Sequence, residues 1–120
     1  MTLSILMVDD SPILLNIQKK LIEKEGYAVT TATSGKEALC TLKQHRYDLI
    51  LMDMQMPEMN GLETAAQVRN IGISTPILAL TGNDSHEDKQ KCLAQGMNGF
   101  VAKPLKMPAL IQELNKLSLG

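Results

Sequence analysis

The sequence predicts an α/β fold in which a parallel sheet is covered by helices on both faces. Strand-like and helix-like segments alternate along all 120 residues. Five β–α units in a row are typical of this architecture. Polar residues follow four of the apolar runs, at the edge where parallel sheets bind ligands. We expect one domain over residues 1–120.

Five apolar runs are the expected strands, near 4–8, 27–32, 48–53, 76–80 and 98–102. The third and fourth are continuous apolar runs, as expected for strands that are buried on both faces.

Helical patterns fill the intervals between these strands. Ser11 caps the first helix with Pro12 at its first position, and Leu14, Ile17 and Leu21 recur there at helical spacing before Gly26 ends it. Ser34 and Glu37 are expected to form a capping box at the start of the second helix. The third helix is expected to begin at Gly61 and the fifth at Pro108. Ser85 is the expected cap of the fourth helix, which ends at Gly96.

The composition excludes several classes of protein. One Phe, two Tyr and no Trp leave an aliphatic core and no aromatic platform for single-stranded nucleic acid. A net charge of −1 gives no basic footprint for nucleic acid, and no run reaches the roughly 20 apolar residues of a membrane span. We expect Cys40 and Cys92 to be buried thiols of a reduced, cytoplasmic protein.

Five side chains at the strand ends form the predicted site. Asp9 and Asp10 follow the first strand, Asp53 ends the third, Thr81 follows the fourth and Lys103 the fifth. Three carboxylates against one ammonium leave −3 + 1 = −2, which a divalent cation balances, and oxygen ligands favour Mg²⁺. The Thr81 hydroxyl and the Lys103 ammonium are suited to a phosphate. Gly82 leaves its own backbone N–H open to close approach.

Several motifs together resemble the receiver domain of two-component response regulators. They are Met7-Val8-Asp9-Asp10-Ser11, Leu51-Met52-Asp53-Met54-Gln55-Met56-Pro57, Asn60-Gly61, Leu80-Thr81-Gly82 and Ala102-Lys103-Pro104. The resemblance covers essentially the whole chain. It implies a flavodoxin-like, doubly wound five-stranded sheet in the order 2-1-3-4-5 with five helices.

The resemblance also assigns roles to the site residues. Asp53 takes a phosphoryl group from a phosphohistidine on a histidine kinase or histidine phosphotransfer domain. Asp10, Asp53 and the Gln55 carbonyl bind Mg²⁺, and Asp9 acts through water or positions the ion. The phosphoryl group is bound by Lys103, Thr81 and the backbone N–H groups of Met54 and Gly82, and Thr81 and Phe100 form the switch. The chain then catalyses only its own phosphorylation and dephosphorylation and is not a separate enzyme.

An apolar patch beside the site is the expected surface for the phosphohistidine partner. It consists of Leu14 on the first helix with Pro104 and Leu105 after the last strand. The alternative that Leu14 packs inward stays open. The stretches 53–63 and 91–97 look like receivers attached to hybrid histidine kinases. The domain is therefore part of a larger protein or free-standing, and a monomer or weak dimer.

Two other functions fit the residues at the strand ends less well. An aspartyl-phosphate-forming phosphatase has a second Asp two residues after its nucleophile, where this chain has Gln55. A flavodoxin-like FMN carrier needs a Ser/Thr/Gly-rich phosphate loop after the first strand, and this chain has the acidic stretch Asp9-Asp10-Ser11-Pro12.

Overall fold

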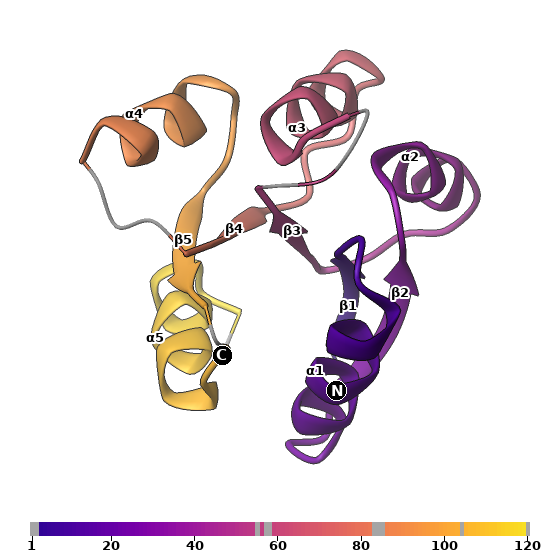
Figure 1. Cartoon of the computed structure of the whole chain (residues 1–120), viewed down its shortest axis with the longest axis vertical. Helices are drawn as coiled ribbons and strands as arrows, with labels where there is room; N and C mark the ends of the chain where they lie inside the picture. The colour runs from indigo at the N-terminus through magenta and orange to yellow at the C-terminus, as the bar shows by residue number, and fades with distance from the viewer. Residues whose placement is uncertain (1–2, 55, 57–58, 83–85, 104, 120) are drawn as a thin grey trace.

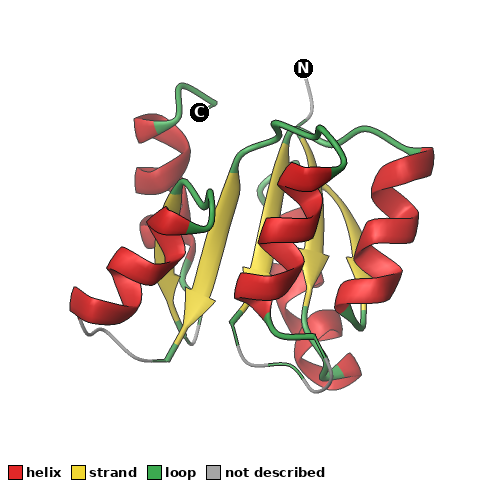
Figure 2. Cartoon of the chain, turned by 90° about the horizontal axis from the view of Figure 1, so that it is seen from above, coloured by secondary structure: helices red, strands yellow, loops and turns green. Residues whose placement is uncertain are grey.

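The five strands lie side by side in one parallel sheet in the order β2-β1-β3-β4-β5. The computed structural model describes residues 3–54, 56, 59–82, 86–103 and 105–119. The strands are β1 (Ser4–Val8), β2 (Ala28–Ala32), β3 (Leu49–Asp53), β4 (Ile77–Thr81) and β5 (Gly99–Ala102). This order confirms the flavodoxin-like fold, and Figure 2 shows that all five strands end at the same edge of the sheet.

One helix follows each strand, and the helices cover both faces of the sheet. They are α1 (Pro12–Glu23), α2 (Gly35–Gln44), α3 (Gly61–Asn70), α4 (His86–Ala94) and α5 (Met107–Lys116). Figure 1 shows α1 and α5 on one face and α2, α3 and α4 on the other. None of the described helices has both the length and the apolar character needed to cross a membrane.

The alternation of side chains along the strands divides the core into two aliphatic layers. In β3, Leu49 and Leu51 pack toward α1 and α5, whereas Ile50 and Met52 pack toward α2, α3 and α4. All four side chains are fully buried. The predicted continuous apolar run is thus a central strand covered on both faces, and Asp53 is its last residue.

The apolar face of α1 differs by one residue from the sequence prediction. The buried positions are Leu15, Gln18 and Ile22, whereas Leu14 and Ile17 are 43% and 57% exposed. Both sets have the same spacing along a helix. The buried set contains a glutamine, whereas Leu14 and Ile17 are left in solvent and Leu21 is only partly buried against the core.

Helix starts mostly follow the predicted caps, with one correction. The Ser34 hydroxyl accepts the Glu37 N–H, at 3.1 Å. The Glu37 carboxylate, however, accepts from the Thr33 hydroxyl and not from the Ser34 backbone, so the predicted capping box is wrong in that half. A complete capping box is formed instead by Asn60 and Glu63 at the start of α3. The predicted cap Ser85 lies outside the described residues.

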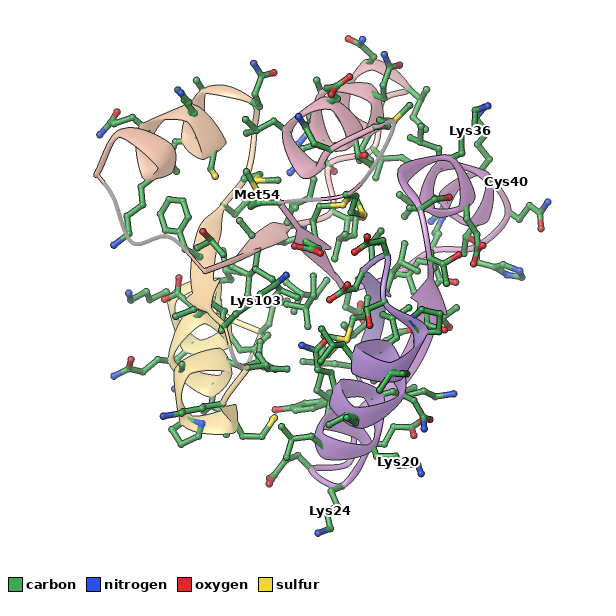
Figure 3. The ribbon with its side chains drawn as sticks, viewed as in Figure 1. Lys20, Lys24, Lys36, Cys40, Met54 and Lys103 are labelled. Atoms are coloured by element: carbon green, nitrogen blue, oxygen red, sulfur yellow. The ribbon has the colours of Figure 1, made fainter. Side chains whose placement is uncertain are left out.

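The two cysteines occupy different environments. Cys92, a residue of α4, is buried in the core, as predicted. Cys40 is exposed and lies on the outer side of α2 (Figure 3). The prediction that both are core residues is therefore wrong for Cys40.

Candidate functional site

Three carboxylates meet where β1 and β3 end side by side. The pairing of Val8 with Met52 places Asp9 and Asp10 next to Asp53. Carboxylate oxygens of the three residues all lie within 4.8 Å of one another. Asp9 and Asp53 are only 1% and 2% exposed, whereas Asp10 is exposed. The predicted acidic site is therefore assembled by two neighbouring strands.

Asp9 is buried at the base of this cluster. Its Oδ1 accepts the Ser11 N–H, at 3.0 Å, and its buried Oδ2 has no hydrogen-bond partner among the described residues. Burial raises the pKa of Asp9 above its ordinary value. The Ser11 N–H and the Lys103 charge act against this increase, and the Asp53 carboxylate adds to it. A buried oxygen without a partner, next to two further carboxylates, fits the donor set of a hard divalent cation.

Lys103 brings a positive charge to the acidic cluster from the far edge of the sheet. Its Nζ lies 2.6 Å from Oδ1 of Asp53. The Lys103 backbone N–H donates to the Thr81 carbonyl, at 2.9 Å, which ties the end of β5 to β4. In Figure 3 the side chain extends from the end of β5 toward the middle of the molecule. The long lysine stem thereby spans β4 and reaches β3.

Thr81 and Gly82 border the same site from β4. Leu80 pairs with Asp53 in the ladder between β3 and β4, so the Thr81 side chain follows directly beside the acidic cluster. A hollow of about 230 Å³ is lined by Thr81, Gly82 and Lys103 together with residues of α4, β5 and α5. Apart from its chain neighbours, no heavy atom of the described residues lies within 4 Å of a Cβ built on Gly82, so a ligand can approach its backbone closely.

Two of the predicted backbone contacts remain predictions. The Met54 N–H, a predicted phosphate donor, donates to the Leu80 carbonyl in this structure, at 3.2 Å. The Gln55 carbonyl, the predicted metal ligand, lies outside the described residues.

Gly61 has a structural role that the sequence analysis missed. A Cβ at this position would collide with the Asp53 carbonyl and with Cα of Met54. The Gly61 N–H instead donates to the Met54 carbonyl, at 3.3 Å. The start of α3 therefore packs directly on the backbone that carries Asp53. An Asn-Gly pair soon after a strand-end Asp is the sequence signal for this contact.

The predicted apolar patch is only partly present. Leu14 is exposed, but Leu105 is only 6% exposed and belongs to the core layer with Leu110 and Leu114. The exposed position assigned to Leu105 is therefore wrong, because its side chain packs with the buried side of α5. Pro104 lies outside the described residues.

An exposed apolar surface is nevertheless present on α1. Ile13, Leu14 and Ile17 are 74%, 43% and 57% exposed and lie on the first two turns of the helix that follows Asp10. We call these three residues the α1 surface. Ile13 was not among the residues predicted for a partner surface, and Ile17 was predicted only as part of the helical spacing of this segment.

Comparison with known proteins agrees with this geometry. Residues 5–115 match the response regulator receiver domain family. The hybrid signal transduction histidine kinase B of Dictyostelium discoideum is 40% identical over 129 residues, covering 97% of this chain and 7% of that protein. The sensor histidine kinase RcsC of Salmonella typhi is 36% identical over 110 residues, covering 92% of this chain and 12% of that protein. The chain thus spans a small part of these curated relatives.

Solved structures show the same fold. The chemotaxis protein CheY4 of Vibrio cholerae superposes with a TM-score of 0.89 at 36% identity, covering 97% of this chain and 98% of that chain. A co-crystal structure of the Saccharomyces cerevisiae phosphotransfer protein Ypd1 with the receiver domain of Ssk1 gives a TM-score of 0.87 at 31% identity, covering 96% of this chain and 88% of that chain. Because sequence and fold agree over nearly its whole length, the chain belongs to the response regulator receiver domains of two-component and phosphorelay signalling.

Proposed function

We propose that Asp53 is the phosphoacceptor of this receiver domain. The observation that carries the proposal is the ion pair between Asp53 and Lys103 inside the acidic cluster. Asp53 ends the central, fully buried strand β3, and Gly61 packs on its backbone. Phosphoryl transfer depends mainly on such positioning and on neutralising the developing charge.

The transfer step follows from the groups at the site. A carboxylate oxygen of Asp53 attacks the phosphorus atom of a phosphohistidine. The new P–O bond forms as the P–N bond breaks, and the imidazole leaves with the electron pair of that bond. Lys103 stays beside the acceptor carboxylate and stabilises the charge on the transferred group. Thr81 and the open backbone of Gly82 supply hydrogen-bond donors to its oxygens. The chain acts in this way on itself and is not a separate enzyme.

The acidic cluster is the proposed site of a magnesium ion. Asp9, Asp10 and Asp53 would hold it, together with the Gln55 carbonyl that the resemblance implies. The buried Oδ2 of Asp9 without a partner supports this assignment. Mg²⁺ would supply positive charge that draws the phosphoryl oxygens toward Asp53.

The phosphoryl donor is a phosphohistidine on a histidine kinase or a histidine phosphotransfer domain, in the cytoplasm. The co-crystal structure of the Ssk1 receiver with Ypd1 supports a donor of the second kind. We propose that the donor docks on the α1 surface, because these exposed apolar side chains directly follow Asp10 in the chain. The receiver itself is a monomer or weak dimer and contacts neither nucleic acid nor a membrane.

Phosphorylation is proposed to switch the position of Thr81 and Phe100. Thr81 moves toward the phosphoryl group, and the Phe100 ring turns inward behind it. Both residues line the hollow that also contains Lys103. Because Phe100 has no hydroxyl, its inward position depends on packing alone.

Acetyl phosphate tests the acceptor without a partner protein. Wild-type protein should gain one phosphoryl group by intact mass, and Asp53→Asn should gain none. Asp48→Asn is the matched control, because Asp48 lies just before the opposite end of β3 and its carboxylate accepts the Ser4 N–H. It should be labelled like the wild type. Equal labelling of Asp53→Asn would refute the assignment.

A further inference from the structure

Two helices contact Phe100, the single phenylalanine of the chain. From α5, Oε1 of Glu113 accepts the Phe100 backbone N–H, at 3.3 Å. From α4, the Lys89 ammonium lies 5.8 Å from the centroid of the Phe100 ring. The ring is half-buried against the core layer that includes Cys92 of α4. The backbone and the ring of the proposed switch residue are therefore fixed separately.

The contact between Lys89 and Phe100 borders the phosphoacceptor site. Lys89, Phe100, Thr81 and Lys103 all line the hollow of about 230 Å³, and Lys103 pairs with Asp53. The Lys89 ammonium and the Phe100 ring therefore border the same hollow as the lysine that contacts Asp53.

We propose that Lys89 is a positioning residue that holds the Phe100 ring in its unphosphorylated place by a cation–π contact. The proposal rests on the proposed function of Asp53 and adds a control to its switch. The contact exists only while the ring keeps this position, so the inward turn that follows phosphorylation of Asp53 has to break it. Lys89 thus sets the balance between the two ring positions.

The expected effect is moderate but measurable. A cation over a partly exposed aromatic ring changes a two-state ratio by about two- to fivefold. That factor matters here because Phe100 has no hydroxyl with which to form a hydrogen bond in its inward position. A small contact on the outward side therefore has a large share in setting the balance.

Selective labelling makes the ring directly visible. Protein grown with ring-¹³C phenylalanine gives NMR signals from Phe100 alone. Wild-type protein with and without beryllofluoride and Mg²⁺ defines the two end states. Lys89→Gln should shift the free signal toward the beryllofluoride position and tighten beryllofluoride binding by about two- to fivefold. Lys91→Gln is the matched control, since it removes an exposed charge two residues along the same helix, and it should match the wild type.

Ring fluorination distinguishes the loss of the cation–π contact from an indirect effect of the Lys89→Gln substitution on α4. Fluorine withdraws electron density from the ring face and weakens its attraction for a cation. Fluorinated Phe100 should tighten beryllofluoride binding in the wild type and have no further effect in Lys89→Gln. Equal effects of fluorination in both backgrounds, or a Lys89→Gln variant that matches the wild type, would overturn the role of Lys89.

The NMR titration and acetyl phosphate labelling together distinguish a failure of this proposal from a failure of the proposed function. If beryllofluoride does not change the wild-type Phe100 signal while acetyl phosphate still labels Asp53, the assignment of Asp53 as acceptor is supported and the positioning role of Lys89 is wrong. If Asp53→Asn is labelled like the wild type, the proposed function itself is wrong.

Discussion

Nζ of Lys103 lies 2.6 Å from Oδ1 of Asp53, and the two residues are 50 positions apart in the chain. This one contact joins the ends of β3 and β5 across β4. The Asp53 side chain is 3% exposed and that of Lys103 is 28% exposed. The pair therefore links a buried acceptor to the more open edge of the sheet.

Removal of the Lys103 charge should strengthen Mg²⁺ binding and weaken the switch. Lys103→Met takes one positive charge away from the acidic cluster, so Mg²⁺ affinity should rise roughly tenfold, or about 1.4 kcal/mol. Labelling by acetyl phosphate should persist in part, but the Phe100 signal should no longer follow it. Calorimetric titration with Mg²⁺ checks the first effect. A weaker Mg²⁺ affinity in this variant would contradict the charge balance.

Removal of Asp10 should abolish Mg²⁺ binding with little cost to the fold. Asp10 is exposed, so Asp10→Ala leaves no buried gap. Excess Mg²⁺ should raise the thermal midpoint of the wild type, since an ion that binds only the folded state stabilises it. The midpoint of Asp10→Ala should not respond. Asp48→Ala, which changes a carboxylate at the other end of β3, should respond normally. An unchanged response in Asp10→Ala would exclude Asp10 as a ligand.

The raised pKa of Asp9 makes the free energy of unfolding of the metal-free protein depend on pH. Burial raises this pKa above its ordinary value of 3.8, so the folded protein binds the proton more tightly than the unfolded chain. The ionised carboxylate therefore costs stability above the folded pKa. That cost shrinks as pH falls through the folded pKa and is absent below 3.8.

Urea unfolding without metal tests this linkage. Asp9→Asn should have a higher free energy of unfolding than the wild type at neutral pH, and the difference should shrink as the pH is lowered. Excess Mg²⁺ should reverse the order, because the ion stabilises only the chain with the complete cluster. A difference that grows on acidification would show that the pKa is lowered and not raised.

Gly61 should be intolerant of a side chain. In Gly61→Ala the new methyl group meets the Asp53 carbonyl and Cα of Met54, both of which are backbone. We expect a loss of about 1–3 kcal/mol in the free energy of unfolding. Gly82→Ala is the control, because apart from its chain neighbours no heavy atom of the described residues lies within 4 Å of its added Cβ and its φ is not positive. Equal stabilities of the two variants would show that α3 does not depend on this close approach.

The α1 surface should affect phosphoryl transfer from a protein donor and not from a small-molecule donor. Ile13→Glu and Ile17→Glu should each lower the rate of transfer from a phosphohistidine protein by about tenfold and leave labelling by acetyl phosphate unchanged. Ile111→Glu on α5 is the matched control, since Ile111 is also a surface isoleucine, 36% exposed. If the control and the α1 variants fall together, the α1 surface is not the docking site.

The sequence predicted the strands well because burial on both faces leaves a strong signal. The continuous run Leu49-Ile50-Leu51-Met52 has no other simple explanation, and the observed strand ends differ from the predicted ones by at most one residue. The polar residues that follow those runs then came together as expected, since parallel strands all end at one edge.

Helix faces and loops were predicted less well. In α1 the sets Leu14-Ile17-Leu21 and Leu15-Gln18-Ile22 have identical spacing, so the pattern alone could not select the buried one. Leu105 follows a strand-end loop, and only the tertiary packing under α5 shows that it is buried.

Chemical mapping of the phosphorylated residue tests the central claim most directly. After transfer from a phosphohistidine protein, borohydride reduces an aspartyl phosphate to homoserine, which peptide mass spectrometry assigns to a position. Homoserine at position 53 alone is the predicted result. Homoserine at position 9 or 10, with Asp53 unchanged, would contradict the account, because the residues assigned to the metal would then be the acceptor.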